Sequence, residues 1–263
     1  MNIAVLIKQV PVSNKVSVDP ETHALIRSSA EGMINPSDRN GIEAALRLRD
    51  AYGGKAAVFT MGPPQAESAL REAMAIGCDE AYLVSDRAFG RADTLATARV
   101  LAAAVKAAGN FDLVCCGALS SDGATGQVAA MVAEALDWPQ AVEINDVKDV
   151  SDDGRSIRIS KDLGKQNYLA EIQLPAVLTF QFGCNEPRLA TLRSTRNAKK
   201  KPLTVLSNKE LNMPADRIGA AGSPSIVIDS WSAQAAGMAE MLEGTPEELA
   251  GQMRRMIAEE REK

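Results

Sequence analysis

The stretch from Val114 to Gln127, VCCGALSSDGATGQ, constrains the fold more than any other part of the sequence. An apolar run ends there in a loop of Gly, Ser and Asp, and this loop leads directly into the apolar-periodic segment 128–136. The pattern predicts a buried strand, a glycine-rich turn and the start of a helix. Such a turn brings free backbone N–H groups and the positive end of a helix dipole to one point, which is the arrangement that binds a nucleotide phosphate.

The first half of the chain alternates short apolar runs with longer segments of helical periodicity. Strands are expected within residues 3–10, 56–61, 81–85 and 111–117, and helices within 36–51, 65–76 and 94–108. The alternation predicts an α/β fold with a doubly wound, mostly parallel sheet, as in Rossmann-like nucleotide-binding folds. End signals support the helices, because Asn35 with Pro36 is typical of a helix start and Gly53 and Gly109 are typical of helix ends.

The pattern changes after Ile144. A DG turn at residues 153–154 separates alternating runs and predicts antiparallel strands. Residues 199–230 carry prolines and no sustained period, which indicates an extended arm, and Thr245 with Glu248 has the spacing of a capping box for a terminal helix. We therefore divide the chain into an α/β nucleotide-binding domain, residues 1–184, and an arm with a terminal helix, residues 185–263.

Charge and composition exclude several functions. A net charge of −5 argues against a general nucleic-acid binder. The sequence has no apolar run long enough to insert in a membrane and no export signal at its start, so we expect a cytoplasmic protein. Four cysteines without CxxC spacing and one histidine, His23, favour reduced core thiols over a metal site or a Ser-His-Asp site. Any redox chemistry would therefore come from a cofactor.

Ligands of doubly wound sheets bind beyond the carboxyl ends of the strands, where the strand-to-helix loops converge. The loops that meet this description are residues 8–13, 35–38 together with 60–65, 85–93 and 117–127. An alternative interpretation is that they are ordinary turns, since such loops need Gly, Ser and Asp in any case. The chain has neither GxGxxG in its first loop nor GxxxxGK[ST], and Asp93 fits a helix cap better than a chemical role.

The second candidate site is the basic segment 185–203, NEPRLATLRSTRNAKKKPL, which holds six cations and the single acid Glu186. It fits a solvated charge run, an RNA contact or an acidic protein partner. Aromatic residues are missing from the segment, which weakens the RNA interpretation. Leu189 or Leu192 beside basic residues favours a docking loop, in which a small apolar anchor gives affinity and charge steers the encounter.

Seven motifs give the chain a resemblance to the β subunit of electron-transfer flavoprotein over essentially its whole length. They are VLIKQVP, INPSDRNGIEAALRLRD, TMGPPQAE, SDRAFGRADT, DGATGQ, LPAVLT, and NEPRLATL followed by AKKK. GPPQAESALREAMAIG and SDRAFGRADT resemble the electron-bifurcating branch of the family. DGATGQVAA, Arg91 and the WPQ of residues 138–140 depart from that branch, and WPQ is similar to the simple branch.

The resemblance implies a heterodimer with an α subunit, around which the C-terminal arm wraps. In the bifurcating branch the β subunit holds FAD, which takes a hydride from NADH. One electron then goes to ferredoxin or flavodoxin, and the other passes through the α-subunit FAD to an acyl-CoA dehydrogenase or similar flavoenzyme. This is our leading hypothesis. The alternatives are a simple electron-transfer β subunit that holds structural AMP, and a non-redox adenine-nucleotide binding module.

The family motifs also imply site residues, though none of them is catalytic and none binds a metal. The chain is thus an electron carrier, with NADH oxidation by the heterodimer if it bifurcates. The implied cofactor contacts are Leu6, Lys8, Asn35, Asp38, Met61, Gly62, Gln65, Thr94, Thr97, Asp122, Gly123, Thr125, Gly126, Gln127 and Val128. The implied partner-docking residues are Leu192, Arg193, Lys199, Lys200 and Lys201.

Overall fold

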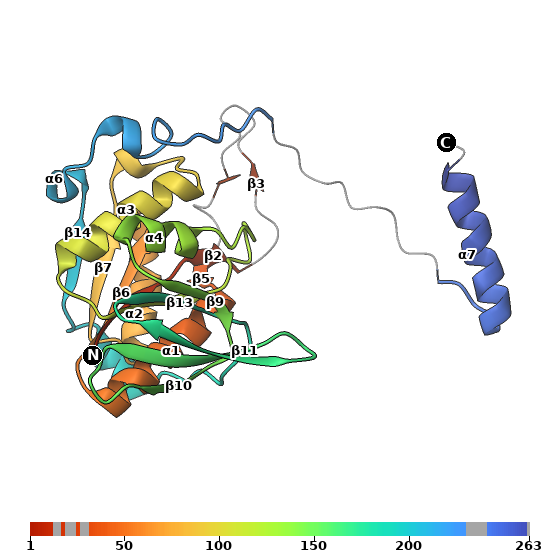
Figure 1. Ribbon diagram of the computed structural model, residues 1–263. Helices are drawn as coiled ribbons and strands as arrows, with labels where there is room; N and C mark the ends of the chain where they lie inside the picture. The colour runs from red at the N-terminus through yellow and green to blue at the C-terminus, as the bar shows by residue number, and fades with distance from the viewer. Residues whose placement is uncertain (13–16, 19–24, 27–31, 230–240, 262–263) are drawn as a thin grey trace. The chain divides into compact units, whose positions relative to one another are not determined.

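A computed structural model describes residues 1–12, 17–18, 25–26, 32–229 and 241–261 (Figure 1). Ser13, in the first of the predicted loops, and His23 lie outside these residues. The chain divides into two compact units, Met1–Ile228 and Asp229–Lys263, which are described separately.

A seven-stranded sheet forms the centre of the first unit, and every neighbouring pair of its strands is parallel. The strand order is β14-β7-β6-β1-β8-β13-β9. The strands are β1 (Asn2–Leu6), β6 (Lys55–Met61), β7 (Glu80–Val84), β8 (Leu113–Gly117), β9 (Gln140–Ile144), β13 (Ala176–Phe180) and β14 (Leu203–Leu206). The predicted strand regions all contribute to this sheet, and the predicted fold class is confirmed.

Helices cover both faces of the sheet. The helices of the first unit are α1 (Pro36–Tyr52), α2 (Glu67–Ile76), α3 (Thr94–Ala108), α4 (Val128–Leu136), α5 (Leu192–Ala198) and α6 (Asn208–Leu211). Ile3 and Val5 of β1 belong to the core under α1 and α2, whereas Ala4 and Leu6 belong to the core under α3 and α4. Because both faces are covered, the strands read as continuous apolar runs rather than as an alternation.

Smaller sheets and turns complete this unit. The predicted DG turn is confirmed, with Gly154 at φ 68° between two antiparallel strands. The strands are β10 (Asp146–Val150), β11 (Ser156–Asp162) and β12 (Asn167–Gln173), and the short pairs are β2 (Gln9–Pro11) with β5 (Gly32–Ile34) and β3 (Ser17–Val18) with β4 (Leu25–Ile26). Single 3-10 turns are η1 (Pro64–Ala66), η2 (Arg87–Phe89) and η3 (Ala215–Arg217).

The segment predicted to be an irregular arm, residues 199–230, is partly regular. Its residues Leu203–Leu206 form β14, which pairs in parallel with β7 at the edge of the sheet. A four-residue edge strand gives almost no periodic signal, because one side of it stays open and Val205 remains exposed. The compact first unit therefore extends to Ile228, and the division of function at residue 184 stays a prediction.

Among the described residues of the second unit, 229 and 241–261, the chain forms helix α7 (Pro246–Arg261). The predicted capping box is present, since the Thr245 N–H donates to Glu248 Oε2 at 2.8 Å and the Glu248 N–H donates to Thr245 Oγ1 at 3.4 Å. Met253, Met256 and Ile257 are exposed on this helix. Within the ranges that the structure describes, every helix is too short or too polar to cross a membrane.

We predict that Gly41→Ala destabilises the chain although it improves helix propensity by about 1 kcal/mol. The new methyl group would lie 2.9 Å from the carbonyl carbon of Cys116, so α1 and β8 would have to move apart. Overpacking of this kind costs about 1–3 kcal/mol. The measurement is the melting temperature of the full chain by circular dichroism.

Gly251→Ala in α7 is the matched control, because its methyl group meets no described atom within 4 Å. It should leave the melting temperature unchanged or raise it. A melting temperature for Gly41→Ala equal to or above that of the wild type would contradict the close approach of α1 to β8.

Candidate functional site

The candidate site lies where the chain changes direction in the sheet. From β1 the chain builds β6 and β7 on one side and then returns to form β8 on the other side of β1. The order of the strands therefore reverses between β1 and β8, and such a switch point is where doubly wound sheets bind ligands. We call the place between the loops that follow these two strands the crevice. Lys8 follows β1, and the glycine-rich loop, residues 118–127, follows β8.

Asp38 joins the two strand ends to the first turn of α1. One carboxylate oxygen accepts the Lys8 N–H at 2.7 Å and the other accepts the Gly117 N–H at 3.1 Å. The side chain is almost fully buried, at 5% exposure. Burial raises the pKa of Asp38 to about 7, against hydrogen bonds from the Lys8 N–H, the Asn35 side chain and the Gly117 N–H, which lower it. Asp38 therefore fixes the backbone at the carboxyl ends of β1 and β8.

Asn35 holds the glycine-rich loop from the side of α1. Its Nδ2 donates to the Leu119 carbonyl at 2.9 Å, and its Oδ1 accepts the Ser121 N–H at 3.0 Å. The sequence places Asn35 correctly before the helix, but its side chain makes no cap bond among the described residues, because both of its polar atoms are used on the loop. Ser37, which the sequence analysis missed, adds a 2.6 Å bond from its hydroxyl to the Leu119 carbonyl.

Glycine is the only residue type that fits at position 117, where β8 ends. A Cβ there would lie 2.5 Å from both Asp38 Oδ1 and Ser37 Oγ. The signal that could have revealed Ser37 was the pair of hydroxyl and carboxyl residues directly after Pro36. A first-turn serine usually caps its own helix or faces water, so the sequence alone does not indicate a bond to a loop 82 residues away.

Lys8 reaches across the crevice to the same loop. Its ammonium lies 2.6 Å from Asp122 Oδ1 and 3.4 Å from Ser120 Oγ. The ion pair places the Lys8 ammonium at the carboxyl ends of the strands, and the Asp122 carboxylate balances its charge. Backbone turns at Ala124, φ 50°, and Gly126, φ 63°, then bring the loop to the start of α4.

The first turn of α4 has donors that no side-chain cap satisfies among the described residues. Gln127 occupies the cap position, but its Oε1 instead accepts the Thr94 hydroxyl at 3.0 Å. In contrast, α3 is capped by Asp93, which accepts the Ala96 N–H at 2.9 Å, so the structural interpretation of Asp93 is confirmed. A helix start that lacks a side-chain cap and follows a glycine-rich loop is a suitable site for an anion.

The other predicted contact residues lie at strand ends, in connecting loops and on helices α3 and α4. Leu6 is buried in β1, and Met61 and Gly62 end β6, where the Gly62 N–H donates to the Val84 carbonyl. Gln65 is exposed in η1, and Thr97 is half-buried on α3. The remaining predicted residues of the loop and α4 are Gly123 and Thr125, both exposed, and Val128, half-buried.

Comparison with known proteins assigns the family. Residues 22–211 match the model described as "Electron transfer flavoprotein domain". The chain is 43% identical over 229 residues to "Electron transfer flavoprotein subunit beta" of Thermoanaerobacterium thermosaccharolyticum, covering 87% of this chain and 86% of that one. The chain belongs to the β-subunit family of electron transfer flavoproteins. This family binds flavin or AMP.

Two further relatives of this electron transfer flavoprotein chain have names that mention reductases. "Caffeyl-CoA reductase-Etf complex subunit CarD" of Acetobacterium woodii is 39% identical over 255 residues, which cover 96% of both chains. "Acryloyl-CoA reductase electron transfer subunit gamma" of Anaerotignum propionicum is 37% identical over 256 residues, which cover 94% of both chains.

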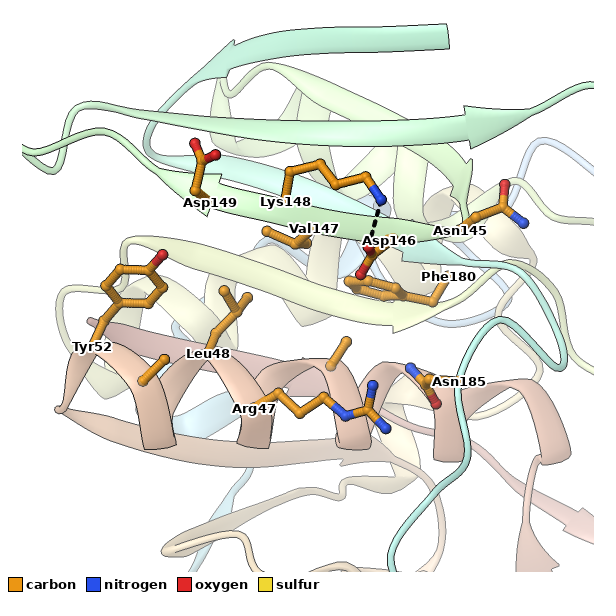
Figure 2. A pocket seen from close by; sticks show the side chains of 12 residues that line it. Arg47, Leu48, Tyr52, Asn145, Asp146, Val147, Lys148, Asp149, Phe180 and Asn185 are labelled. Atoms are coloured by element: carbon orange, nitrogen blue, oxygen red, sulfur yellow. Dashed lines mark hydrogen bonds and ion pairs between the residues drawn. The ribbon is translucent and has the colours of Figure 1, made fainter. Parts of the chain in front are cut away.

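Two cavities are lined by residues other than the predicted cofactor contacts. One, of about 200 Å³, lies between α1 and β10 and has an apolar wall that includes Leu48 and Phe180, with Arg47 and Lys148 at its polar side (Figure 2). The other is a more open hollow beside α3, lined by residues that include Arg99 and Arg217. The candidate site is therefore defined by its hydrogen bonds and helix start rather than by either cavity.

The predicted docking residues divide into two groups. Leu192 begins α5 with 90% of its surface exposed, and Arg193, Lys199 and Lys200 are exposed near it. Lys201 differs, because its ammonium donates to the Met74 carbonyl at 3.0 Å and to the Cys78 carbonyl at 2.6 Å. It therefore binds the C-terminal end of α2.

The cysteines of this electron transfer flavoprotein chain are all described and unpaired. Cys78, Cys115 and Cys116 are buried, and burial raises the pKa of the Cys78 thiol to about 12 and raises the pKa of the other two. These thiols are thus protonated and unreactive at neutral pH. In the described part of the chain, His, Cys, Asp and Glu side chains form no cluster of metal-binding size.

We predict that Asp38 makes the chain less stable as the pH rises toward 7. The pKa of Asp38 is about 7 in the folded chain and near 3.8 in the unfolded chain. The contribution of Asp38 to the free energy of unfolding is therefore complete below pH 3.8 and falls as the pH rises from 3.8 to 7. The limiting slope is about 1.4 kcal/mol per pH unit. Urea unfolding of the wild type and Asp38→Asn between pH 5 and 8 measures it.

Asp38→Asn is expected to cost a constant amount, because its NH2 group replaces one of the two oxygens that accept the Lys8 and Gly117 N–H groups and so places a donor against a donor. The difference in unfolding free energy between the two proteins should shrink from pH 5 to 7 and become constant above pH 7. A difference that is constant over the whole range would contradict a raised pKa.

Proposed function

We propose that this chain is the β subunit of a heterodimeric electron transfer flavoprotein and that FAD binds at the crevice between β1 and β8. The single observation that supports the site best is the first turn of α4. Its donors follow a loop that Asn35 and Lys8 bind, and Asp38 binds the Gly117 N–H directly before that loop, so the backbone is positioned before a ligand arrives. Preorganised donors of this kind suit the phosphates of a dinucleotide.

The residues at the crevice suit the phosphates of FAD by the hydrogen-bond donors and the positive charge that they offer. The α4 start, Gln127 and the Lys8 ammonium would face the phosphates, and Thr94 and Thr97 would face the flavin end. When bound, FAD supplies hydride acceptance and one-electron transfer, and the protein supplies binding and orientation. Lys8 would exchange part of its bond to Asp122 for a phosphate oxygen, which keeps the ammonium paired in both states.

We propose NADH as the electron donor and electron bifurcation as the activity. One electron would go to ferredoxin or flavodoxin and the other to the FAD of the α subunit. The support is the similarity of GPPQAESALREAMAIG and SDRAFGRADT to the bifurcating branch. The first motif spans the β6–α2 connection and α2, and the second forms the β7–α3 connection; both connections follow the carboxyl ends of neighbouring strands.

The final acceptor that we propose is an acyl-CoA dehydrogenase or a similar flavoenzyme, which contacts Leu192. Two relatives support this class of partner, because their names place them with caffeyl-CoA reductase and acryloyl-CoA reductase. We further propose that the complex acts in the cytoplasm, where unpaired cysteines are stable.

A specific observation favours a second candidate, a simple electron carrier with AMP in the same crevice. DGATGQVAA and the WPQ of residues 138–140 differ from the bifurcating pattern, and they form the glycine-rich loop and the residues directly after α4. The α4 start would hold the AMP phosphate equally well.

We predict two FAD molecules per purified αβ heterodimer, released by denaturation and counted by absorbance and chromatography. Gly126→Val should lose the β-subunit FAD while the α-subunit FAD stays, because Gly126 has φ 63° and its Cβ would lie 3.5 Å from the Ala118 carbonyl oxygen. Gly154→Val, at φ 68° in the β10–β11 turn, imposes the same strain away from the crevice and should retain both flavins.

A count of one FAD and one AMP per wild-type heterodimer would identify AMP, rather than FAD, as the ligand of this subunit and would contradict the bifurcating proposal. A heterodimer of Gly126→Val with full occupancy of both sites would contradict the location of the site. A stable monomer that binds ATP or AMP and no flavin would favour the non-redox module instead.

A further inference from the structure

We propose that the docking segment, residues 189–197, is held in a fixed position by two polar anchors, one on α1 and one on α2. Glu43, Arg188 and Lys201 are then positioning residues for recognition of the acceptor flavoenzyme. The inference rests on the proposed function of Leu192 as the contact with that enzyme. It adds residues that lie behind the contact and never touch the partner.

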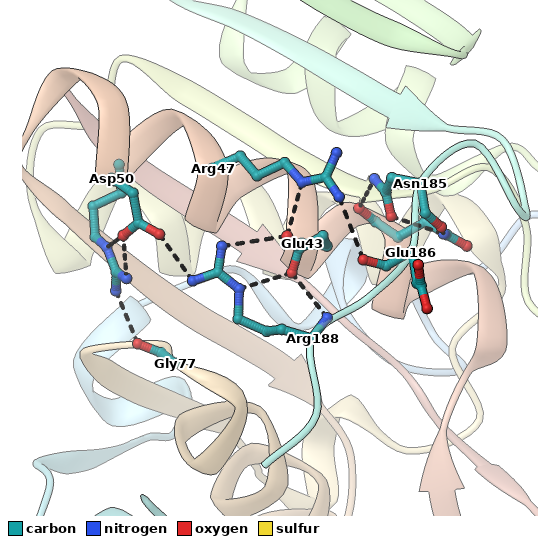
Figure 3. A network of polar contacts seen from close by, with 9 residues as sticks. Glu43, Arg47, Asp50, Gly77, Asn185, Glu186 and Arg188 are labelled. Atoms are coloured by element: carbon teal, nitrogen blue, oxygen red, sulfur yellow. Dashed lines mark hydrogen bonds and ion pairs between the residues drawn. The ribbon is translucent and has the colours of Figure 1, made fainter. Parts of the chain in front are cut away.

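The first anchor is a buried carboxylate on α1 (Figure 3). Glu43 Oε2 accepts both the Arg188 N–H at 3.1 Å and the Arg188 Nε at 2.8 Å, and Glu43 Oε1 accepts Arg47 Nε at 2.8 Å. Only 5% of the Glu43 side chain is exposed. Arg188 also reaches Asp50 on the next turns of α1, with an N–O distance of 2.8 Å. The backbone of Arg188 is thereby fixed directly before Leu189.

An amide pair strengthens the same anchor. Asn40 Nδ2 donates to the Asn185 carbonyl at 2.8 Å and to Asn185 Oδ1 at 2.9 Å, and Asn185 Nδ2 returns a bond to the Asn40 carbonyl at 3.0 Å. Asn40 Oδ1 accepts the Gly183 N–H at 3.2 Å. Asn40 and Glu43 are three residues apart, so they share one face of α1 and together fix residues 183–188.

The second anchor fixes the other end of the segment to α2. Arg71 donates to the carbonyls of Ala198 and Lys201, each at 3.1 Å. Lys201 donates in return to the carbonyls of Met74 and Cys78, which lie at the end of α2. Ala198, the last residue of α5, is buried in the core that also contains the apolar residues of α2. Thus α2 supplies Arg71 to the carbonyl groups of residues 198 and 201, and residue 201 supplies its ammonium to the carbonyl groups at the end of α2.

Between the anchors the chain presents apolar side chains to solvent. Leu189 and Leu192 are 85% and 90% exposed. A capping box, in which Thr191 Oγ1 accepts the Ser194 N–H at 3.1 Å and Ser194 Oγ accepts the Thr191 N–H at 2.9 Å, fixes the turn that carries them. Both ends and the turn are held before binding, so the ordering cost of association is small. The surface fits an apolar pocket with acidic groups at its edge, because exposed Lys199 and Lys200 follow it.

The test measures electron delivery by the intact heterodimer to a purified short-chain acyl-CoA dehydrogenase, chosen as the one that the wild type reduces with the lowest KM. Glu43→Gln removes the charge of the first anchor, and Lys201→Met removes the second. We expect each to raise KM about tenfold, with kcat within twofold of the wild type and an unchanged cofactor count. Amide hydrogen exchange in residues 189–197 should become faster in both variants.

Lys200→Met is the matched control for Lys201→Met, because it removes the same charge from an exposed neighbour. Its effect on KM, relative to the wild type at the same ionic strength, should disappear at high salt, since exposed charges are screened. The effect of Lys201→Met on KM should persist at high salt, because Lys201 fixes the position of the docking segment. Asp149→Asn, which breaks an exposed ion pair with Arg158 on the small sheet, controls for loss of a carboxylate and should leave KM unchanged.

Leu192→Ala separates this inference from the proposed function. If Leu192→Ala raises KM while Glu43→Gln and Lys201→Met stay within twofold of the wild type, the docking contact stands and the anchors are overturned. If Leu192→Ala also leaves KM unchanged, the docking contact is wrong and the anchors lose their role with it. Arg188→Lys keeps the charge with fewer donors and should give an intermediate KM if the bonds to Glu43 position the segment.

Discussion

The buried carboxylate of Asp38 is the interaction on which the arrangement of the crevice depends. It accepts N–H groups from Lys8 and Gly117, and so ties the carboxyl ends of β1 and β8 to the first turn of α1. Two strand ends and a helix start are thereby fixed around one group that has little access to water. Gly117 is required because any side chain would overlap with that carboxylate, and the glycine-rich loop begins directly after it.

Helix α1 connects the candidate crevice with the proposed docking segment. Its start supplies Asn35 and Asp38 to the loops of the crevice, and its next turns supply Asn40 and Glu43 to residues 183–188. These four polar residues are buried and bound by other parts of the chain. The chain contributes position in both places, which suits a protein whose chemistry would come from a bound cofactor.

Local patterns in the sequence were sufficient for the sheet and its helices, because buried parallel strands and amphipathic helices have clear periods. They were insufficient where contacts join distant residues. Glu43 and Arg188 are separated by 145 positions, so α1 reads as a helix with a solvent-facing acid. For the same reason Lys201 read as part of a charged docking run, although its ammonium is bound to the end of α2. The short edge strand β14 had too few residues to show a period.

We propose that an adenine-containing molecule binds where β1, β8 and α4 meet, and a crystal structure of the purified αβ heterodimer without added ligand would test this. We expect density for such a molecule in the crevice, with a phosphate at the first-turn N–H groups of α4. The Asp38 carboxylate should still bind the Lys8 and Gly117 N–H groups. A crevice filled by the protein's own side chains, with the nucleotide bound elsewhere or missing, would contradict it.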